Sequence, residues 1–307
     1  MKKIAFLILI SLFLLGCSLP FSITWNTTPT PQVETPIQVP VTPTVGVIAT
    51  EQPATEAVPT ATPLNGTELN LGGVYMVLPP CMAATASGTL IPAVLYNEYS
   101  GPMEYYPENR KIAFQGYPLS GGFFEVDGSD QGGLTIYPIA DFVAMNQPTI
   151  SPIVTNMQIL LADKPAIPQS IPFLPVFNAA QVFRAQVKYL DFINGQGVRF
   201  LTEYAQYSAP VNNHDLFYAF QGITADGKYW VSAILPVNAV YLQAAYDSAN
   251  VPAGGILAPS MDSPNYIADM DTYYINMLNK LNTTPDADFT PGLDCLDQYI
   301  QSLQISD

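Results

Sequence analysis

The sequence predicts an α+β fold around a mainly antiparallel sheet. Three observations support this prediction. Residues 183–237 contain two consecutive β-hairpin patterns, each with a turn that contains glycine. Several other segments repeat apolar residues at helical spacing. A stretch rich in proline and threonine, residues 17–66, separates the start of the chain from everything that follows. We therefore expect a single globular domain over residues 67–307.

The first hairpin pattern lies in residues 183–207. Glycines supply the positive φ angles that tight turns require, and they cluster here around Gly195-Gln196. A loop at these two residues would place Lys188 opposite Glu203, so that the two strands would share an ion pair.

The second hairpin pattern turns at Asp226-Gly227, and its natural register places Ile223 opposite Trp230. Both faces of its strands are apolar, which is typical of strands in the middle of a sheet that is covered on both sides. The helices expected as covers span residues 139–145, 151–165, 266–281 and 290–303, the last two near the C-terminus. Further strands are expected at residues 73–78, 93–99, 111–117, 123–126 and 134–137.

Residues 1–16 have the order of a secretory signal segment. Lys2 and Lys3 precede an apolar stretch, residues 4–15, which is shorter than the roughly 20 residues that a membrane-spanning helix needs. A plain secretory signal and an uncleaved membrane anchor are the alternative interpretations of this segment.

The run Leu14-Leu15-Gly16-Cys17 resembles the lipobox of bacterial lipoproteins. The resemblance covers only this segment, and it implies that Cys17 becomes the mature N-terminus with a diacylglycerol on its sulfur and a further acyl chain, such as palmitate, on its amine. Two or more acyl chains anchor a protein stably, at about 0.8 kcal/mol for each buried methylene group. The implied location is the cell membrane or the outer membrane, on the extracytoplasmic face, with the lipid bilayer as a partner.

The segment after Cys17, residues 18–66, is a tether. It repeats threonine and proline and contains neither lysine nor arginine. Because proline fixes φ and removes a hydrogen-bond donor, this composition can build neither a helix nor a sheet. We expect an extended spacer of up to about 3.1 Å per residue.

The chain is strongly acidic. It has 10 basic and 25 acidic residues, a formal net charge of −15. Its lysines and arginines form no cluster, whereas nucleic-acid binding relies on such clusters. We therefore exclude nucleic acid as a partner.

Cys81 and Cys295 are the cysteines that remain once Cys17 is lipidated. Exported chains live in oxidising conditions, so we expect these two to form a disulfide. Two buried, unpaired thiols are the alternative. The spacing of the cysteines offers no metal site, and we expect no cofactor.

His214 is the only histidine, and it lies in the run Asn212-Asn213-His214-Asp215. This run favours a turn, because Asn and Asp side chains hydrogen-bond to nearby backbone. His214 and Asp215 are nevertheless the candidate ligand-binding residues. Catalysis by His214 is a weaker hypothesis, because Asp215 is too close in sequence to be an assured orienting partner and no Gly-x-Ser-x-Gly motif is present.

Residues 127–133 loosely resemble a calcium-binding loop. Asp127, Ser129 and Asp130 could supply oxygen ligands before a glycine, but the closing bidentate glutamate is lacking. We prefer a hairpin turn without a metal as the interpretation of this segment.

The expected function is a non-catalytic binding or interaction domain for an unknown extracytoplasmic ligand or protein. The alternative is an extracytoplasmic hydrolase that acts on a glycan or peptide polymer through carboxylates or His214. Binding would favour a concave patch lined by aromatic side chains. Catalysis would require two acids, or His214 and a serine, in one cleft.

Overall fold

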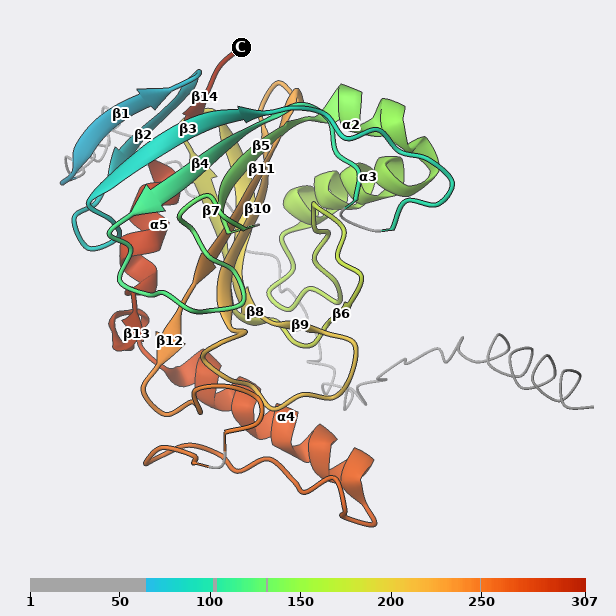
Figure 1. Cartoon of the computed structure of the whole chain (residues 1–307), viewed down its shortest axis with the longest axis vertical. Coiled ribbons are helices and arrows are strands. Elements are labelled where there is room, and N and C mark those ends of the chain that lie inside the picture. The colour runs from blue at the N-terminus through green and yellow to red at the C-terminus, as the bar shows by residue number, and fades with distance from the viewer. Residues whose placement is uncertain (1–64, 102–103, 131, 249) are drawn as a thin grey trace, which may run out of the picture. The chain divides into compact units, whose positions relative to one another are not determined.

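A computed structural model describes residues 65–101, 104–130, 132–248 and 250–307, all of which belong to one compact unit, residues 60–307. The signal segment, the lipobox-like run and nearly all of the tether lie outside the described residues. A seven-stranded antiparallel sheet forms the centre of this unit (Figure 1). Its strands, in spatial order, are β3 (Thr85–Ile91), β4 (Asn109–Gln115), β5 (Gly133–Pro138), β11 (Tyr229–Pro236), β10 (Phe217–Thr224), β8 (Gly195–Thr202) and β7 (Ala185–Phe192).

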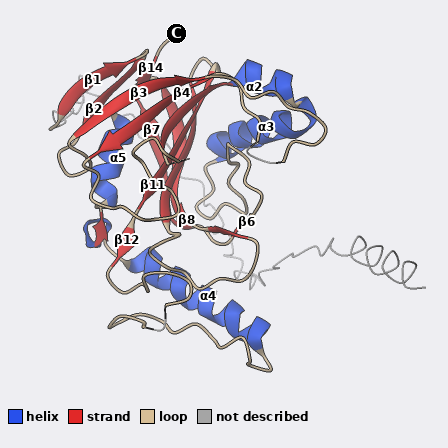
Figure 2. Cartoon of the chain, in the orientation of Figure 1, coloured by secondary structure: helices blue, strands red, loops and turns tan. Residues whose placement is uncertain are grey.

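Smaller elements complete the unit (Figure 2). A three-stranded sheet consists of β1 (Thr67–Leu71), β2 (Val74–Leu78) and β14 (Gln304–Ile305). Two short strand pairs join β6 (Ala180–Gln181) to β9 (Tyr204–Ala205) and β12 (Asn238–Ala239) to β13 (Phe289–Thr290). The helices are α2 (Ile139–Met145), α3 (Gln147–Asp163), α4 (Tyr266–Thr283), α5 (Leu293–Gln301) and a short 3₁₀ helix, η1 (Asp286–Asp288).

Both faces of the seven-stranded sheet are covered, as the apolar hairpin predicted. Figure 1 shows α2 and α3 on one side of the sheet and α5 on the other. Neighbouring residues of β10 point into different cores: Ala219 packs with α2 and α3, whereas Phe220 packs with α4, α5 and β2. The predicted α+β fold, with a mainly antiparallel sheet and two helices near the C-terminus, is confirmed. None of the helices in the described residues is both long and apolar enough to cross a membrane.

The second hairpin has the predicted register. Ile223 lies opposite Trp230, and the turn contains Asp226-Gly227. Gly227 has a φ of +72°, which is the conformation that the sequence pattern requires of a glycine.

The predicted register of the first hairpin is wrong. Phe192 lies opposite Gly195, so that the loop consists of residues 193–194, two residues earlier than expected, and Lys188 lies opposite Arg199 instead of Glu203. Gly195 is a strand residue that pairs with Phe192, and its backbone passes so close to the Phe192 ring that an added Cβ would lie 2.1 Å from a ring carbon.

Two features shape this hairpin, a turn at Asn194 and a bulge at Gln186. Asn194 holds the turn, since its side chain accepts a hydrogen bond from the Ile305 N–H (2.9 Å) and donates one to the Ile305 carbonyl (2.6 Å). Gln186 has a φ of +54° and lies in a β-bulge between Ala185 and Lys188. The bulge inserts an extra residue on β7 and shifts the pairing only beyond Lys188, on the side away from the turn.

Other element boundaries also differ from the predictions. The helix expected to begin at residue 151 begins earlier, since α3 has Pro148 in its first turn and Pro152 inside it. In the segment expected as a strand at residues 93–99, only Val94 pairs, through a single bridge to Tyr106. Residues 123–126 form no strand, and β1 and β3, most of whose residues are exposed, were not predicted.

Candidate functional site

A small pocket lies beside His214. Its volume is about 190 Å³. Two segments that are far apart in the sequence form most of its wall, residues 119–125 and the turn that precedes β10. Polar side chains that line the pocket are Ser120, Glu125, Asn213, His214 and Asn238.

The side chains of Asn212 and Asn213 hold the turn that contains His214. The side-chain oxygen of Asn212 accepts hydrogen bonds from the N–H groups of His214 (3.0 Å) and Asp215 (3.1 Å). The Asn213 side chain accepts from the N–H of Ala239 (2.9 Å) and donates to the carbonyl of the same residue (3.1 Å). These bonds form the turn that the Asn and Asp residues predicted, and they fix it against β12.

Asp215 orients the His214 ring. The carboxylate Oδ1 of Asp215 lies 2.7 Å from Nδ1 of His214, and its Oδ2 accepts a hydrogen bond from the Asn212 side chain (2.8 Å). The expectation that Asp215 is too close in sequence to be an assured partner is therefore corrected, because the tight turn brings the two adjacent side chains together. Since Nδ1 is occupied, Nε2 is the ring nitrogen left to meet a ligand; the His214 side chain is 40% exposed.

The loop of residues 119–125 closes over the turn. The N–H of Phe123 donates to the His214 carbonyl (2.7 Å), and the Phe123 ring meets the imidazole edge-on at 6.4 Å between centroids. Glu125 stabilises the loop itself, because its carboxylate accepts a hydrogen bond from the Gly121 N–H (2.6 Å). Ser120 thus lines the same pocket as His214, although the sequence gives no signal that the two residues are neighbours.

A buried carboxyl group, Glu203, lies behind the turn. Its side chain accepts a hydrogen bond from the Asn212 N–H (2.7 Å), and the residue is 1% exposed. Burial raises the pKa of Glu203 well above its ordinary value, and the nearby charge of Asp215 raises it further, against the opposing effect of the Asn212 hydrogen bond. Sequence reasoning missed this residue, because it assigned Glu203 to an ion pair with Lys188.

A second charged cluster lies in the core on the α5 side of the sheet. Arg199 of β8 bonds twice to Asp297 of α5, and Asp297 also accepts hydrogen bonds from Lys188 (2.8 Å) and from the Tyr218 hydroxyl (2.9 Å). Burial, and then the Asp297 charge, raise the pKa of Tyr218 well above its ordinary value. These bonds link β7, β8, β10 and α5 through one buried carboxylate.

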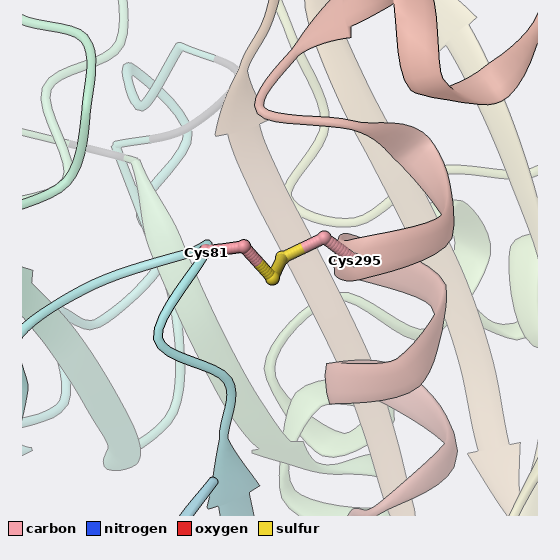
Figure 3. The surroundings of a disulfide bond; sticks show 2 residues. All are labelled: Cys81 and Cys295. Atoms are coloured by element: carbon pink, nitrogen blue, oxygen red, sulfur yellow. A yellow bond between two sulfur atoms is a disulfide. The ribbon is translucent and has the colours of Figure 1, made fainter. Parts of the chain in front are cut away.

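The predicted disulfide between Cys81 and Cys295 is present (Figure 3). Cys81 lies in the turn after β2, and Cys295 lies on α5. The bond joins residues separated by 214 positions in the sequence, and so it links the first strands of the domain to its last helix.

The calcium-like loop is a turn held by its own side chains. The Asp127 carboxylate accepts hydrogen bonds from the N–H (2.8 Å) and the hydroxyl (2.5 Å) of Ser129, and these bonds lower the pKa of Asp127. Lys111 donates a hydrogen bond to the Asp130 carbonyl. Within the described residues, no three His, Cys, Asp or Glu side chains converge as metal ligands.

A wider hollow of about 470 Å³ lies between the end of α3 and the turns of the two hairpins. Two of its polar side chains already have hydrogen-bond partners. Asn194 bonds to Ile305, and Thr224 donates to Asp226 (2.6 Å). Phe192 is the one aromatic residue among those that line it, and Phe124 is the one in the smaller pocket. Neither hollow is lined mainly by aromatic side chains, as the sequence-based expectation for a binding patch would have required.

Comparisons of the chain with models of protein families, with curated proteins and with solved structures found no match.

Proposed function

We propose that the protein is a lipoprotein anchored on the extracytoplasmic side of a bacterial membrane, with a non-catalytic domain that binds a ligand or a protein. The anchor rests on the order of Lys2, Lys3, the apolar stretch and Cys17, followed by a tether. The Cys81–Cys295 disulfide supports an oxidising compartment for the domain, because such bonds are rare in reducing cytosol.

The anchor is tested by phase separation of cell extracts in a detergent that retains acylated proteins. We expect the native chain in the detergent phase and a Cys17→Ser variant outside it. A matched Cys81→Ser, Cys295→Ser variant keeps Cys17 and should stay in the detergent phase. A wild-type chain that partitions into the aqueous phase would contradict the proposal.

The pocket beside His214 is the binding site that the geometry supports best. This choice rests on one observation. Asp215 holds the His214 ring through Nδ1, which leaves Nε2 of His214 for a ligand. Because the pocket of about 190 Å³ is smaller than the roughly 300–1,000 Å³ that encloses a drug-sized ligand, it would hold one residue of a longer glycan or peptide.

Thermal-shift screening with glycans and peptides tests this site. A ligand that raises the melting temperature of the wild type should lose its effect in His214→Ala, while Asp191→Asn, in the wider hollow, should leave the shift unchanged. Loss of the shift only in the Asp191 variant would move the site to the wider hollow.

Hydrolysis is a second candidate, and one observation favours it: Ser120 and His214 line the same pocket, with Asp215 behind the imidazole. This order of groups is the one used when a histidine activates a serine. Ester and peptide substrates should then be cleaved by the wild type, and both Ser120→Ala and His214→Ala should abolish cleavage. Activity that survives both substitutions would exclude this pocket as its source.

A further inference from the structure

The two edges of the seven-stranded sheet are built differently. β7, at one edge, contains a bulge and the charged residues Lys188 and Asp191, and α4 and α5 pack against it. Gln186 in the bulge donates its backbone N–H to the Asn282 side chain of α4 (2.6 Å). Bulges, charges and covering helices keep a strand edge from pairing with other chains.

β3, at the other edge, has none of these features. Its pairing with β4 runs from Thr85 to Ile91 without a register shift, and most of its residues are exposed. Residues 84–97 contain no charged side chain. Leu90 is 59% exposed although it is one of the few large apolar residues of the strand.

The hydrogen bonds of β4 show which backbone groups of β3 face outward. The N–H of Phe114 donates to the Val126 carbonyl (2.6 Å) and not to Ala86, which lies opposite it on β3. Because bonded and non-bonded pairs alternate in an antiparallel ladder, Ala86, Gly88 and Leu90 direct their N–H and C=O groups to the free edge. Within the described residues, these groups have no hydrogen-bond partner.

We propose that β3 pairs with the β3 strand of a second copy of this chain, antiparallel around a two-fold axis at Gly88. In this register Ala86 faces Leu90 of the second copy, and Gly88 faces its own equivalent. Every outward N–H then meets an outward C=O, so the edge is complementary to itself.

Charge and side-chain size favour a second copy as the occupant. Two chains with a net charge of −15 repel each other, and an uncharged edge is a place where they can meet without opposing charges. Leu90 of one copy would cover Ala86 of the other and so lose its exposure to water. Copies anchored to one membrane, as proposed above, would also meet at a high effective concentration.

Ser87 and Thr89 provide a test that is specific to this register. Both are exposed, and across the axis Ser87 of one copy faces Thr89 of the other at a non-bonded position, where side chains approach closely. The double variant S87E/T89E places like charges opposite each other in the pair. The double variant S87K/T89E places opposite charges there. Both double variants have a glutamate at position 89, opposite Lys111 of β4, so they differ only at position 87.

The measurement is sedimentation of the full chain in detergent over a range of concentrations, with thermal unfolding to show that each variant is folded. We expect a concentration-dependent dimer for the wild type, dimerisation weakened by about tenfold or more in S87E/T89E, and a dimer retained in S87K/T89E. A wild type that stays monomeric at its highest soluble concentration would overturn the proposal, as would a dimer that both double variants disrupt or that neither disrupts. A monomer whose β3 edge captures a strand of a different polypeptide would also overturn it, in favour of that partner.

Discussion

Arg199 and Asp297 form a two-point ion pair inside the domain. Nε of Arg199 lies 3.1 Å from Oδ1 of Asp297, and Nη2 lies 3.1 Å from Oδ2, with both side chains at most 5% exposed. The pair joins β8, next to the β7 edge of the sheet, to α5. Asp286 of η1 also approaches Nη2, at 3.3 Å, but its side chain is 33% exposed.

The difference between these two carboxylates gives the first prediction. Asp297→Ala leaves a buried guanidinium without its main partner, and we expect it to reduce the free energy of unfolding by about 3–5 kcal/mol. Asp286→Ala removes a partner that water can partly replace, and we expect a loss of about 1 kcal/mol or less. Urea unfolding of the two variants measures both values. Equal losses would show that burial does not govern the strength of this cluster.

The sequence predicted the register of the second hairpin correctly and that of the first hairpin wrongly, and the difference has a physical reason. Asp226-Gly227 fixes the second hairpin because the turn itself demands a positive φ, so local sequence was sufficient. The first hairpin depends on Asn194 reaching Ile305 and on a bulge at Gln186, whose side chain donates to the carbonyls at the end of α4. These partners are distant in sequence, and a local pattern cannot indicate them.

For the candidate site, too, the sequence predicted the local turn but not the contacts between distant segments. The run at residues 212–215 predicted a turn and named His214 and Asp215, because Asn and Asp determine local backbone structure. The loop with Ser120, the wall of the pocket and the buried position of Glu203 arise from tertiary packing. No spacing in the sequence brings these residues together.

The disulfide gives the second prediction. Removing a native disulfide commonly costs about 2–5 kcal/mol, and the bond between Cys81 and Cys295 closes a long loop. We expect the double variant Cys81→Ala, Cys295→Ala to lose stability in this range. A reducing agent should lower the melting temperature of the wild type and leave the variant unchanged. A reductant that lowers both temperatures equally would show that its effect does not pass through this bond.

Glu203 gives a prediction about pH. Its raised pKa means that the folded state holds the proton to a higher pH than the unfolded state, in which the pKa is near 4.5. The folded state therefore binds more protons, and stability should fall as the pH rises from about 4.5 through the folded pKa. Glu203→Gln keeps an acceptor for the Asn212 N–H, so it should remove this fall and be more stable than the wild type at neutral pH.

Urea unfolding at a series of pH values measures this effect. Asp215→Asn is the companion variant, because it removes the neighbouring charge that raises the pKa of Glu203. The fall in stability should then be smaller than in the wild type and should end at a lower pH. If Glu203→Gln and the wild type have the same pH dependence, Glu203 does not titrate as its burial implies.

Gln221 gives a prediction about the core between the sheet and helices α2 and α3. Its side-chain oxygen accepts hydrogen bonds from the Trp230 indole (2.7 Å) and from the Leu174 N–H (3.0 Å), and its amide donates to the Ser232 hydroxyl (2.8 Å). Gln221→Leu leaves two buried donors unpaired, at about 1–3 kcal/mol for each. Ser232→Ala removes only the acceptor, and we expect about 1 kcal/mol.

Unfolding free energies and tryptophan fluorescence check this prediction together. Trp230 and Trp25 are the two tryptophans of the chain, so replacing Trp25 by Phe leaves a single reporter. We expect the emission of Trp230 to shift in Gln221→Leu and to change little in Ser232→Ala. An unchanged spectrum and stability in the Gln221 variant would mean that water replaces the lost acceptor.

We propose above that Cys17 carries lipid and holds the domain on the extracytoplasmic side of a membrane. Mass spectrometry of the N-terminal peptide of the native protein tests it most directly. We predict a peptide that begins at Cys17, with a mass increased by a diacylglycerol and a further acyl chain. A peptide that still begins at Met1, or a Cys17 with a free thiol, would contradict the claim.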